Sequence, residues 1–119
     1  MRATFPESAR LLKPAEYVNA LRGKRVAKGR LFTVSTPRGP DNPTQARLGL
    51  IIAKRFARRA VSRNTIKRVL RETFRQRRHQ LLPRDYVFRL HSPIPQVSLR
   101  QLKSMVRIEA NALLDRLTP

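Results

Sequence analysis

Residues 54–78 read KRFARRAVSRNTIKRVLRETFRQRR, and this stretch contains eleven basic side chains against a single acid, Glu72. Within it, apolar residues recur at the i, i+3, i+4, i+7, i+8 spacing that places side chains on one face of an α-helix. The residues at those positions are Ile66, Val69, Leu70, Thr73 and Phe74. The stretch therefore predicts an amphipathic helix with one face anchored in the protein core.

The other face of this helix is cationic. At about 100° per residue, the side opposite the apolar stripe carries Asn64, Lys67, Arg68, Arg71, Arg75 and Arg78. A rigid row of guanidinium groups suits a polyanion with regularly spaced phosphates. An i, i+4 ion pair between Arg68 and Glu72 is expected within the helix. Arg77 falls near the apolar stripe, so we expect it to have a structural role.

The length and net charge of the chain indicate a single domain with an anionic partner. The chain has 119 residues, which fits one domain spanning residues 1–119. It contains 27 Lys and Arg against 7 Asp and Glu, a net charge of +20. Self-repulsion of this size opposes compaction unless an anionic partner screens it. A nucleic acid is therefore the leading candidate partner, and an anionic membrane is the second.

Residues that the chain lacks argue against other classes. There is no cysteine, which excludes a disulfide framework and thiolate metal sites. Residues 1–12 contain no apolar segment of the kind found in secretory signals. The longest apolar run, residues 48–53, is too short to span a bilayer. We therefore expect a cytoplasmic protein with no membrane partner.

No catalytic constellation is visible either. The seven acids are scattered, so none forms a pair that could serve as general acid and base or hold catalytic metal ions. The two histidines, His79 and His91, fall in different predicted elements, and no GxxxxGK[ST] loop is present. The sequence thus predicts no catalytic residue and no protein-bound metal.

The segments before the basic helix are punctuated by proline and glycine. A first helix is expected to begin at Pro14 and end before Gly23, with Tyr17, Val18 and Leu21 along one face. Residues 22–30 form a basic connection that could include a short edge strand. Residues 31–36 alternate as a half-buried strand does, and residues 37–44 form a loop. The unbroken apolar centre of residues 47–53 indicates a strand in the interior of a sheet.

The basic helix is expected to start near Ser62, which is a good N-cap residue, and its segment closes at Pro83. A third strand follows at residues 86–90, with Tyr86, Phe88 and Leu90 on one side. Ser98 and Gln101 have capping-box spacing and open a last helix over residues 99–117. Its predicted core face consists of Leu102, Met105, Val106, Ala110, Leu113 and Leu117.

The predicted order is helix, strands, helix, strand, helix. The connection from residues 47–53 through the basic helix to residues 86–90 is long enough to join parallel neighbours. An α+β fold with one mixed sheet and helices packed on it follows.

Residues 47–75, RLGLIIAKRFARRAVSRNTIKRVLRETFR, closely resemble the signature of the protein subunit of bacterial ribonuclease P. The matching motif residues are Arg63, Asn64, Lys67, Arg68, Arg71 and Glu72. Weaker matches extend the similarity over most of the chain, at Phe5, Arg10, Leu11, Tyr17, Gly29, Phe32, Asp85, Tyr86 and Val87. Thr65 departs from the pattern, because the family usually has the second Arg of its motif there. We expect a weakened RNA contact at that position.

The resemblance implies both an architecture and a function. The family fold is a compact α+β domain with a left-handed βαβ crossover, whereas general rules favour the right-handed connection. In the family, an RNA subunit carries out the Mg²⁺-dependent cleavage that removes the 5′ leader of precursor tRNA. The protein binds that RNA and the leader. The implied partners are therefore the ribonuclease P RNA subunit and precursor tRNA, with Mg²⁺ acting through the RNA and no obligate protein partner.

Two binding surfaces follow from the resemblance. The RNA subunit is expected to bind Arg58, Arg59, Arg63, Asn64, Lys67, Arg68, Arg71 and Arg75. The single-stranded leader is expected in a cleft between the first helix and the sheet, at Tyr17, Phe32, Lys54 and Arg55. Aromatic faces can stack on any base and cations follow the backbone. Phe32 could equally be a core residue.

Two other classes share the charge and the basic helix. One is a ribosomal or other structural RNA-binding protein, which would need no aromatic cleft. The other is a protein that binds duplex DNA through the same helix. Copurification with one abundant RNA, and stimulation of the precursor-tRNA cleavage by that RNA when the protein is added, would separate all three.

Overall fold

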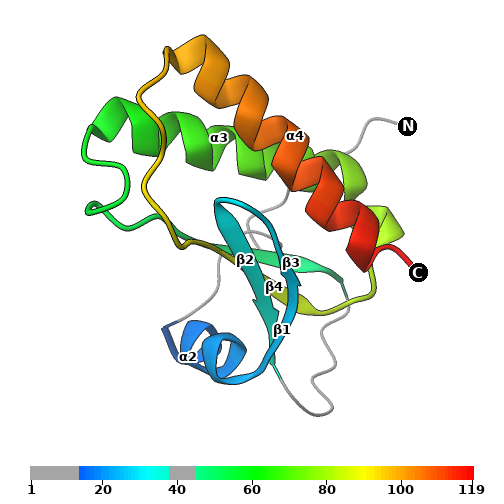
Figure 1. The fold of residues 1–119 in the computed structure, drawn as a ribbon. Coiled ribbons are helices and arrows are strands. Elements are labelled where there is room, and N and C mark those ends of the chain that lie inside the picture. Colours follow the sequence, from blue (N-terminus) through cyan, green and yellow to red (C-terminus); the bar gives the residue numbers. More distant parts are fainter. Residues whose placement is uncertain (1–13, 38–44) are drawn as a thin grey trace.

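The computed structural model describes residues 14–37 and 45–119. Its elements are α2 (Pro14–Arg22), β1 (Lys24–Lys28), β2 (Phe32–Thr36), β3 (Arg47–Ile51), α3 (Ala60–Arg77), the 3-10 helix η1 (Arg78–Gln80), β4 (Asp85–Leu90) and α4 (Leu99–Leu117). Helices α3 and α4 pack together on one side of the sheet, and α2 lies on the other side (Figure 1). The predicted α+β fold is confirmed. The expected loop at residues 38–44 and the matches at Phe5, Arg10 and Leu11 lie outside the described residues.

The four strands form one mixed sheet in the order β1-β2-β4-β3. Strand β2 pairs antiparallel with β1 and β4, while β3 and β4 are parallel neighbours joined through α3, as predicted. The handedness of this crossover stays an implication of the resemblance. The prediction that residues 47–53 lie in the sheet interior is wrong, because β3 is the edge strand. Its apolar run is explained by the layers of helices on both faces of the sheet.

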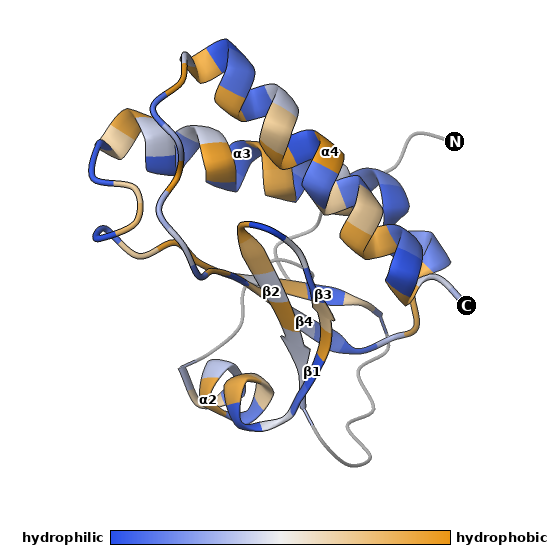
Figure 2. Ribbon diagram, in the orientation of Figure 1, coloured by the Kyte–Doolittle hydropathy of each residue, from blue (hydrophilic) through white to orange (hydrophobic). Residues whose placement is uncertain are grey.

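The main core lies between the sheet and the pair α3 and α4. Phe32, Val34, Phe88 and Leu90 point into it from β2 and β4. Apolar and polar residues alternate along α3 and α4, as expected of helices with one buried face (Figure 2). The buried residues of α3 include the whole predicted stripe, namely Ile66, Val69, Leu70, Thr73 and Phe74. The buried residues of α4 are Leu102, Val106, Ala110, Leu113 and Leu114, with predicted Met105 and Leu117 only half-buried.

A smaller cluster lies on the opposite face of the sheet, under α2. Ala20 is fully buried there against Val87, and Tyr17 and Ile51 pack on them. Val18 and Leu21 remain 45% and 42% exposed, so Tyr17 is the only one of the three residues predicted to share a face of α2 that packs in this cluster. Because α2 covers this face, β2 is buried on both sides and is not the half-buried strand that its alternation predicts.

The helix ends are partly as expected. The N–H of Gly23 donates to Ala20 O at the end of α2, and the capping box between Ser98 and Gln101 is present. The predicted start of α3 at Ser62 is wrong, since the N–H groups of Ser62 and Arg63 both donate to Arg59 O. The first turn of the helix therefore starts before Ser62. Ser62 is a helical residue and is only 6% exposed.

An ion-pair network joins the edge strand to its neighbour and to α2. Arg47 on β3 donates from Nε to Asp85 Oδ1 at 2.6 Å and from Nη2 to Asp85 Oδ2 at 2.8 Å. The same Nη2 also donates to Glu16 on α2. Asp85 is 1% exposed and lies directly opposite Arg47 in the parallel ladder. Hydrogen bonding to Asp85 raises the pKa of Arg47, which keeps the guanidinium charged.

A second polar contact holds α4 to the turn between β1 and β2. The carboxylate of Glu109 accepts from the N–H of Leu31 at 2.9 Å and from that of Phe32 at 2.7 Å. Gly29 makes room for this carboxylate, because a Cβ there would come within 2.8 Å of Glu109 Cδ. The turn and the helix therefore constrain each other.

We expect Arg47→Met to destabilise the protein, because it leaves the buried carboxylate of Asp85 without its cation. The expected loss in the free energy of unfolding is about 3 kcal/mol, the lower end for breaking a buried pair because Arg47 is partly exposed. Arg84→Met removes an exposed neighbouring cation and is the control. Equal unfolding free energies of the Arg47→Met protein and the wild type in urea would contradict the role given to this pair.

Replacing Glu109 by alanine should also destabilise the fold, by about 1–3 kcal/mol, because two backbone N–H groups lose their acceptor. Glu109→Gln keeps one acceptor oxygen and should fall between alanine and wild type. The adjacent Ile108 is 68% exposed, so Ile108→Ala is a matched control with little expected change. Thermal unfolding followed by circular dichroism measures all three, and a melting temperature of Glu109→Ala equal to that of Ile108→Ala would refute the anchor.

Candidate nucleic-acid interface

The cationic face of α3 is exposed where the sequence predicts it. Asn64, Arg68 and Arg71 are exposed and Lys67 is partly exposed, on the side opposite the buried stripe. No described residue forms an ion pair or side-chain hydrogen bond with Lys67, Arg68 or Arg71. These three cations are held on a rigid helix, and their role in RNA binding stays a prediction.

The turn that leads into α3 adds two more exposed cations, Arg58 and Arg59. Arg63, on the first turn of α3, donates from Nη1 to Ala57 O at 2.9 Å and to Arg58 O at 2.8 Å. A guanidinium has five N–H donors, so Arg63 can brace this turn and still offer donors to a ligand. The arrangement places Arg58 and Arg59 at the N-terminal end of the cationic face.

Glu72 pairs differently from the expectation. Arg75 donates to its carboxylate from Nε at 3.1 Å and from Nη2 at 2.5 Å, and Gln76 Nε2 donates at 3.2 Å. The predicted Arg68–Glu72 pair is wrong, because the fork of Arg75 engages both carboxylate oxygens at i, i+3 spacing. The hydrogen bonds to Glu72 raise the pKa of Arg75. Arg68 is thereby left to solvent, while Arg75 is already partly neutralised.

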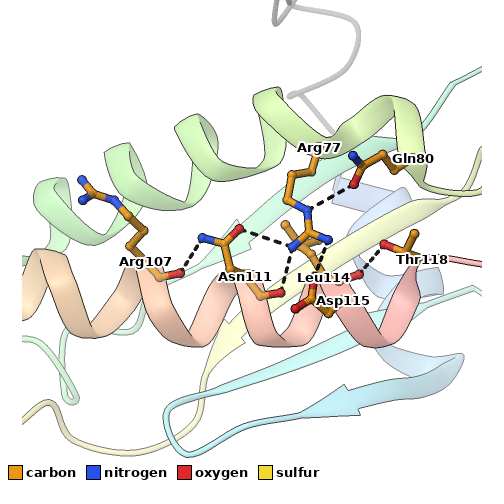
Figure 3. Close-up of polar contacts among 7 residues, drawn as sticks. All are labelled: Arg77, Gln80, Arg107, Asn111, Leu114, Asp115 and Thr118. Carbon is orange, nitrogen blue, oxygen red and sulfur yellow. Dashed lines mark hydrogen bonds and ion pairs between the residues drawn. The ribbon is translucent and has the colours of Figure 1, made fainter.

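The basic side chains at the C-terminal end of α3 bond to other parts of the protein and are not left free in solvent. Arg77 reaches across to α4, where Nη1 donates to Asn111 O at 2.9 Å and Nη2 to Asp115 Oδ1 at 2.5 Å (Figure 3). Its structural role is therefore confirmed. Arg78 is also engaged, since its Nη1 donates to Gln45 Oε1 at 2.8 Å. Within α3, the cations without an ion pair or side-chain hydrogen bond to a described residue are therefore Lys67, Arg68 and Arg71, and the preceding turn adds Arg58 and Arg59.

The structure does not bring the two predicted cleft aromatics together. Phe32 is 0% exposed in the core beneath α3 and α4, so its assignment to a leader cleft is wrong. Tyr17 lies on the opposite face of the sheet, where its hydroxyl accepts from the N–H of Leu50 at 3.4 Å. Lys54 is exposed in the turn just after β3. Of the four predicted cleft residues, Tyr17 therefore lies on α2 itself, and Lys54 is an exposed cation beyond the end of β3.

Arg55 belongs to a different surface. Its guanidinium lies 4.6 Å from the ring centroid of Phe56, a cation–π geometry. Both residues line a cavity of about 780 Å³ with Arg58 and Arg59. Its far wall is the linker before α4, which is tied to Phe56 because the N–H of Ile94 donates to Phe56 O at 3.0 Å. Sequence reasoning missed Phe56, although an aromatic side chain amid basic ones is a recognised signal for nucleic-acid binding.

The described ranges, residues 14–37 and 45–119, contain neither a metal-ligand cluster nor a membrane-spanning helix. Within these ranges, no three His, Cys, Asp or Glu side chains lie together so as to hold a metal ion. In the same ranges, no helix is both long enough and apolar enough to cross a bilayer.

Known proteins resemble the chain over almost its full length. The family model described as Ribonuclease P matches residues 5–117. A "Ribonuclease P protein component" from Bordetella parapertussis is 54% identical, covering 98% of this chain and 97% of that protein. One from Paraburkholderia xenovorans is 38% identical, covering 97% and 84%. The solved structure of a Staphylococcus aureus RNase P protein superposes with a TM-score of 0.67 at 27% identity, covering 90% of this chain and 93% of that one. The chain therefore belongs to the ribonuclease P protein family.

Proposed function

We propose that the basic surface formed by Arg58, Arg59, Lys67, Arg68 and Arg71 binds the RNA subunit of ribonuclease P. Family membership makes the chain the RNA-binding protein subunit of this ribonucleoprotein endonuclease, which processes the 5′ end of tRNA. The ribosomal and DNA-binding alternatives lose their support, because the matched relatives are ribonuclease P proteins.

The observation that carries this proposal is that none of these five cations has a side-chain partner within residues 14–37 and 45–119. No described residue neutralises them, although the part of the chain that the structure describes contains five acids. Lys67, Arg68 and Arg71 are held in fixed directions, because the apolar face of α3 is buried in the core. Phosphate oxygens are the natural ligands for fixed guanidinium and ammonium groups, and binding them releases counterions from the RNA.

Chemistry is proposed to reside in the RNA subunit. We assign Mg²⁺ to the RNA; among the described residues, no three His, Cys, Asp or Glu side chains lie together as a ligand cluster for it. The protein would contribute by screening repulsion between the RNA subunit and precursor tRNA, its proposed substrate. We place this reaction in the cytoplasm, where bacterial precursor tRNA is made.

We further propose that the precursor leader passes over the α2 side of the sheet at Tyr17 and Lys54. Tyr17 is half-buried, which leaves part of its ring accessible, and its hydroxyl end reaches β3. Lys54 is exposed just beyond the same strand. An aromatic face and a nearby cation suit a single strand, because the base stacks and the phosphate pairs with the charge.

Replacing Arg68 or Arg71 by alanine should weaken binding to the isolated RNA subunit without unfolding the protein. Each lost phosphate contact should flatten the plot of log K against log salt concentration by about 0.7 to 0.9. Arg25→Ala on β1 removes an exposed cation far from α3 and serves as the control. The reconstituted enzyme should then need more Mg²⁺ for cleavage.

Two outcomes would count against this assignment. One is unchanged affinity and salt slope in both Arg68→Ala and Arg71→Ala. The other is robust cleavage of precursor tRNA by the protein alone, purified free of RNA.

Tyr17→Ala should weaken binding to precursor tRNA more than to mature tRNA in the assembled complex, because only the precursor has a leader. Loss of one base–aromatic stack corresponds to about 1–3 kcal/mol. Tyr17→Phe keeps the ring and should bind almost as well as wild type. Melting temperatures of the free variants control for lost packing against Val87. Equal losses for both tRNAs would place the leader elsewhere.

A further inference from the structure

Basic side chains of α4 share a groove with those of α3. Two adjoining hollows of about 510 and 360 Å³ lie between the helices, and Arg68, Val69 and Lys103 line both. Arg107 and Glu72 line the larger hollow, and Thr65 and Arg100 line the smaller one. We call this surface, defined by Thr65, Arg68, Arg100, Lys103 and Arg107, the α3–α4 groove.

The α3–α4 groove carries a strong net positive charge. Arg68, Arg100, Lys103 and Arg107 are all exposed, and the cationic group of each forms no ion pair or hydrogen bond with a described residue. Its acid, Glu72, already accepts two hydrogen bonds from Arg75. Four cations that share one concave surface repel each other, so an anion bound between them would be stabilised.

Only one end of the α3–α4 groove is open to a ligand. Toward the C-terminal ends of the two helices, Arg77 bridges to Asn111 and Asp115 and closes the gap between them (Figure 3). The side chain of Arg107 extends from α4 on the side that faces α3 (Figure 3). The open, cationic part of the groove therefore lies toward the N-terminal ends, next to Arg58 and Arg59.

Position 65 contributes no charge to the groove. The hydroxyl of Thr65 donates to Val61 O one turn earlier at 2.8 Å, so it is bound to its own helix. Arg100 and Lys103 of α4 line the same hollow as Thr65. The second helix thus supplies cations beside the turn of α3 that lacks one.

We infer that the α3–α4 groove binds the phosphate backbone of the RNA subunit, with Arg100 and Lys103 as RNA-contacting residues that compensate for the uncharged Thr65. The inference rests on the proposed function and extends its binding surface to the second helix. Arg68 belongs to both surfaces, so one strand can pass from the exposed face of α3 into the groove. This continuity favours RNA over an acidic protein segment.

The experiment compares two double variants with equal charge loss. Arg100→Gln/Lys103→Gln removes the α4 cations, and Lys24→Gln/Arg25→Gln removes one exposed Lys and one exposed Arg from β1. Binding of the isolated RNA subunit is measured at several salt concentrations. The α4 variant should flatten the slope of log K against log salt by about 1.4 to 1.8, twice the value for one phosphate contact. The β1 variant should change it little.

A gain of binding provides the sharper test. Adding Thr65→Arg to the Arg100→Gln/Lys103→Gln variant places a cation in the same hollow from α3. The salt slope should recover by about 0.7 to 0.9, the value for one contact. Circular dichroism melting confirms that each variant is folded.

Three outcomes would overturn the inference. The first is wild-type binding by the α4 variant, the second is an equal loss in the β1 variant, and the third is no recovery on adding Thr65→Arg. The proposed function is tested separately, since Arg68→Ala and Arg71→Ala would still weaken binding if only the groove were wrong.

Discussion

Burial of the apolar stripe of α3 is the contact on which the rest of the structure depends. Ile66 and Phe74 are 0% and 1% exposed, between the sheet and α4. Because the helix cannot rotate without exposing them, the cations on its opposite face are held in fixed directions. Helix α3 is also the chain connection between β3 and its parallel neighbour β4. Packing of α3 on the sheet therefore accompanies the pairing of these two strands. One face of this amphipathic helix therefore forms part of the core, and its opposite face forms an exposed basic surface.

The few acids of the described part of the chain all have structural partners. Each of the five acids in the described part of the chain is engaged within the protein. Glu16 and Asp85 bind Arg47, Glu72 binds Arg75, Asp115 binds Arg77, and Glu109 accepts from backbone N–H groups. These contacts hold elements together or neutralise one cation each, so none of the five masks Arg58, Arg59, Lys67, Arg68 or Arg71. A net charge of +20 is thereby compatible with a folded protein that leaves its binding surface unneutralised.

Local patterns predicted the features that depend on local geometry. The buried stripe of α3, the capping box at Ser98 and Gln101, and the facing of Tyr86, Phe88 and Leu90 on β4 follow from residue spacing within one element. The errors arose where a second element decides burial. Phe32 is enclosed because α3 and α4 cover its face of the sheet, and β3 is apolar at an edge because helices cover both faces.

The sequence by itself determined the cationic helix, the α+β class and the family, because these depend on residue spacing, charge and a motif within continuous stretches of the chain. Only the tertiary structure decided which cations are free. Arg63 and Arg75 belong to the same predicted RNA-binding set as Arg68, yet each bonds a neighbouring carbonyl or carboxylate. The tertiary structure also placed Arg100 and Lys103 beside Thr65, more than 30 residues away in the chain. Such proximity depends on how two helices pack, and spacing within one helix carries no information about it.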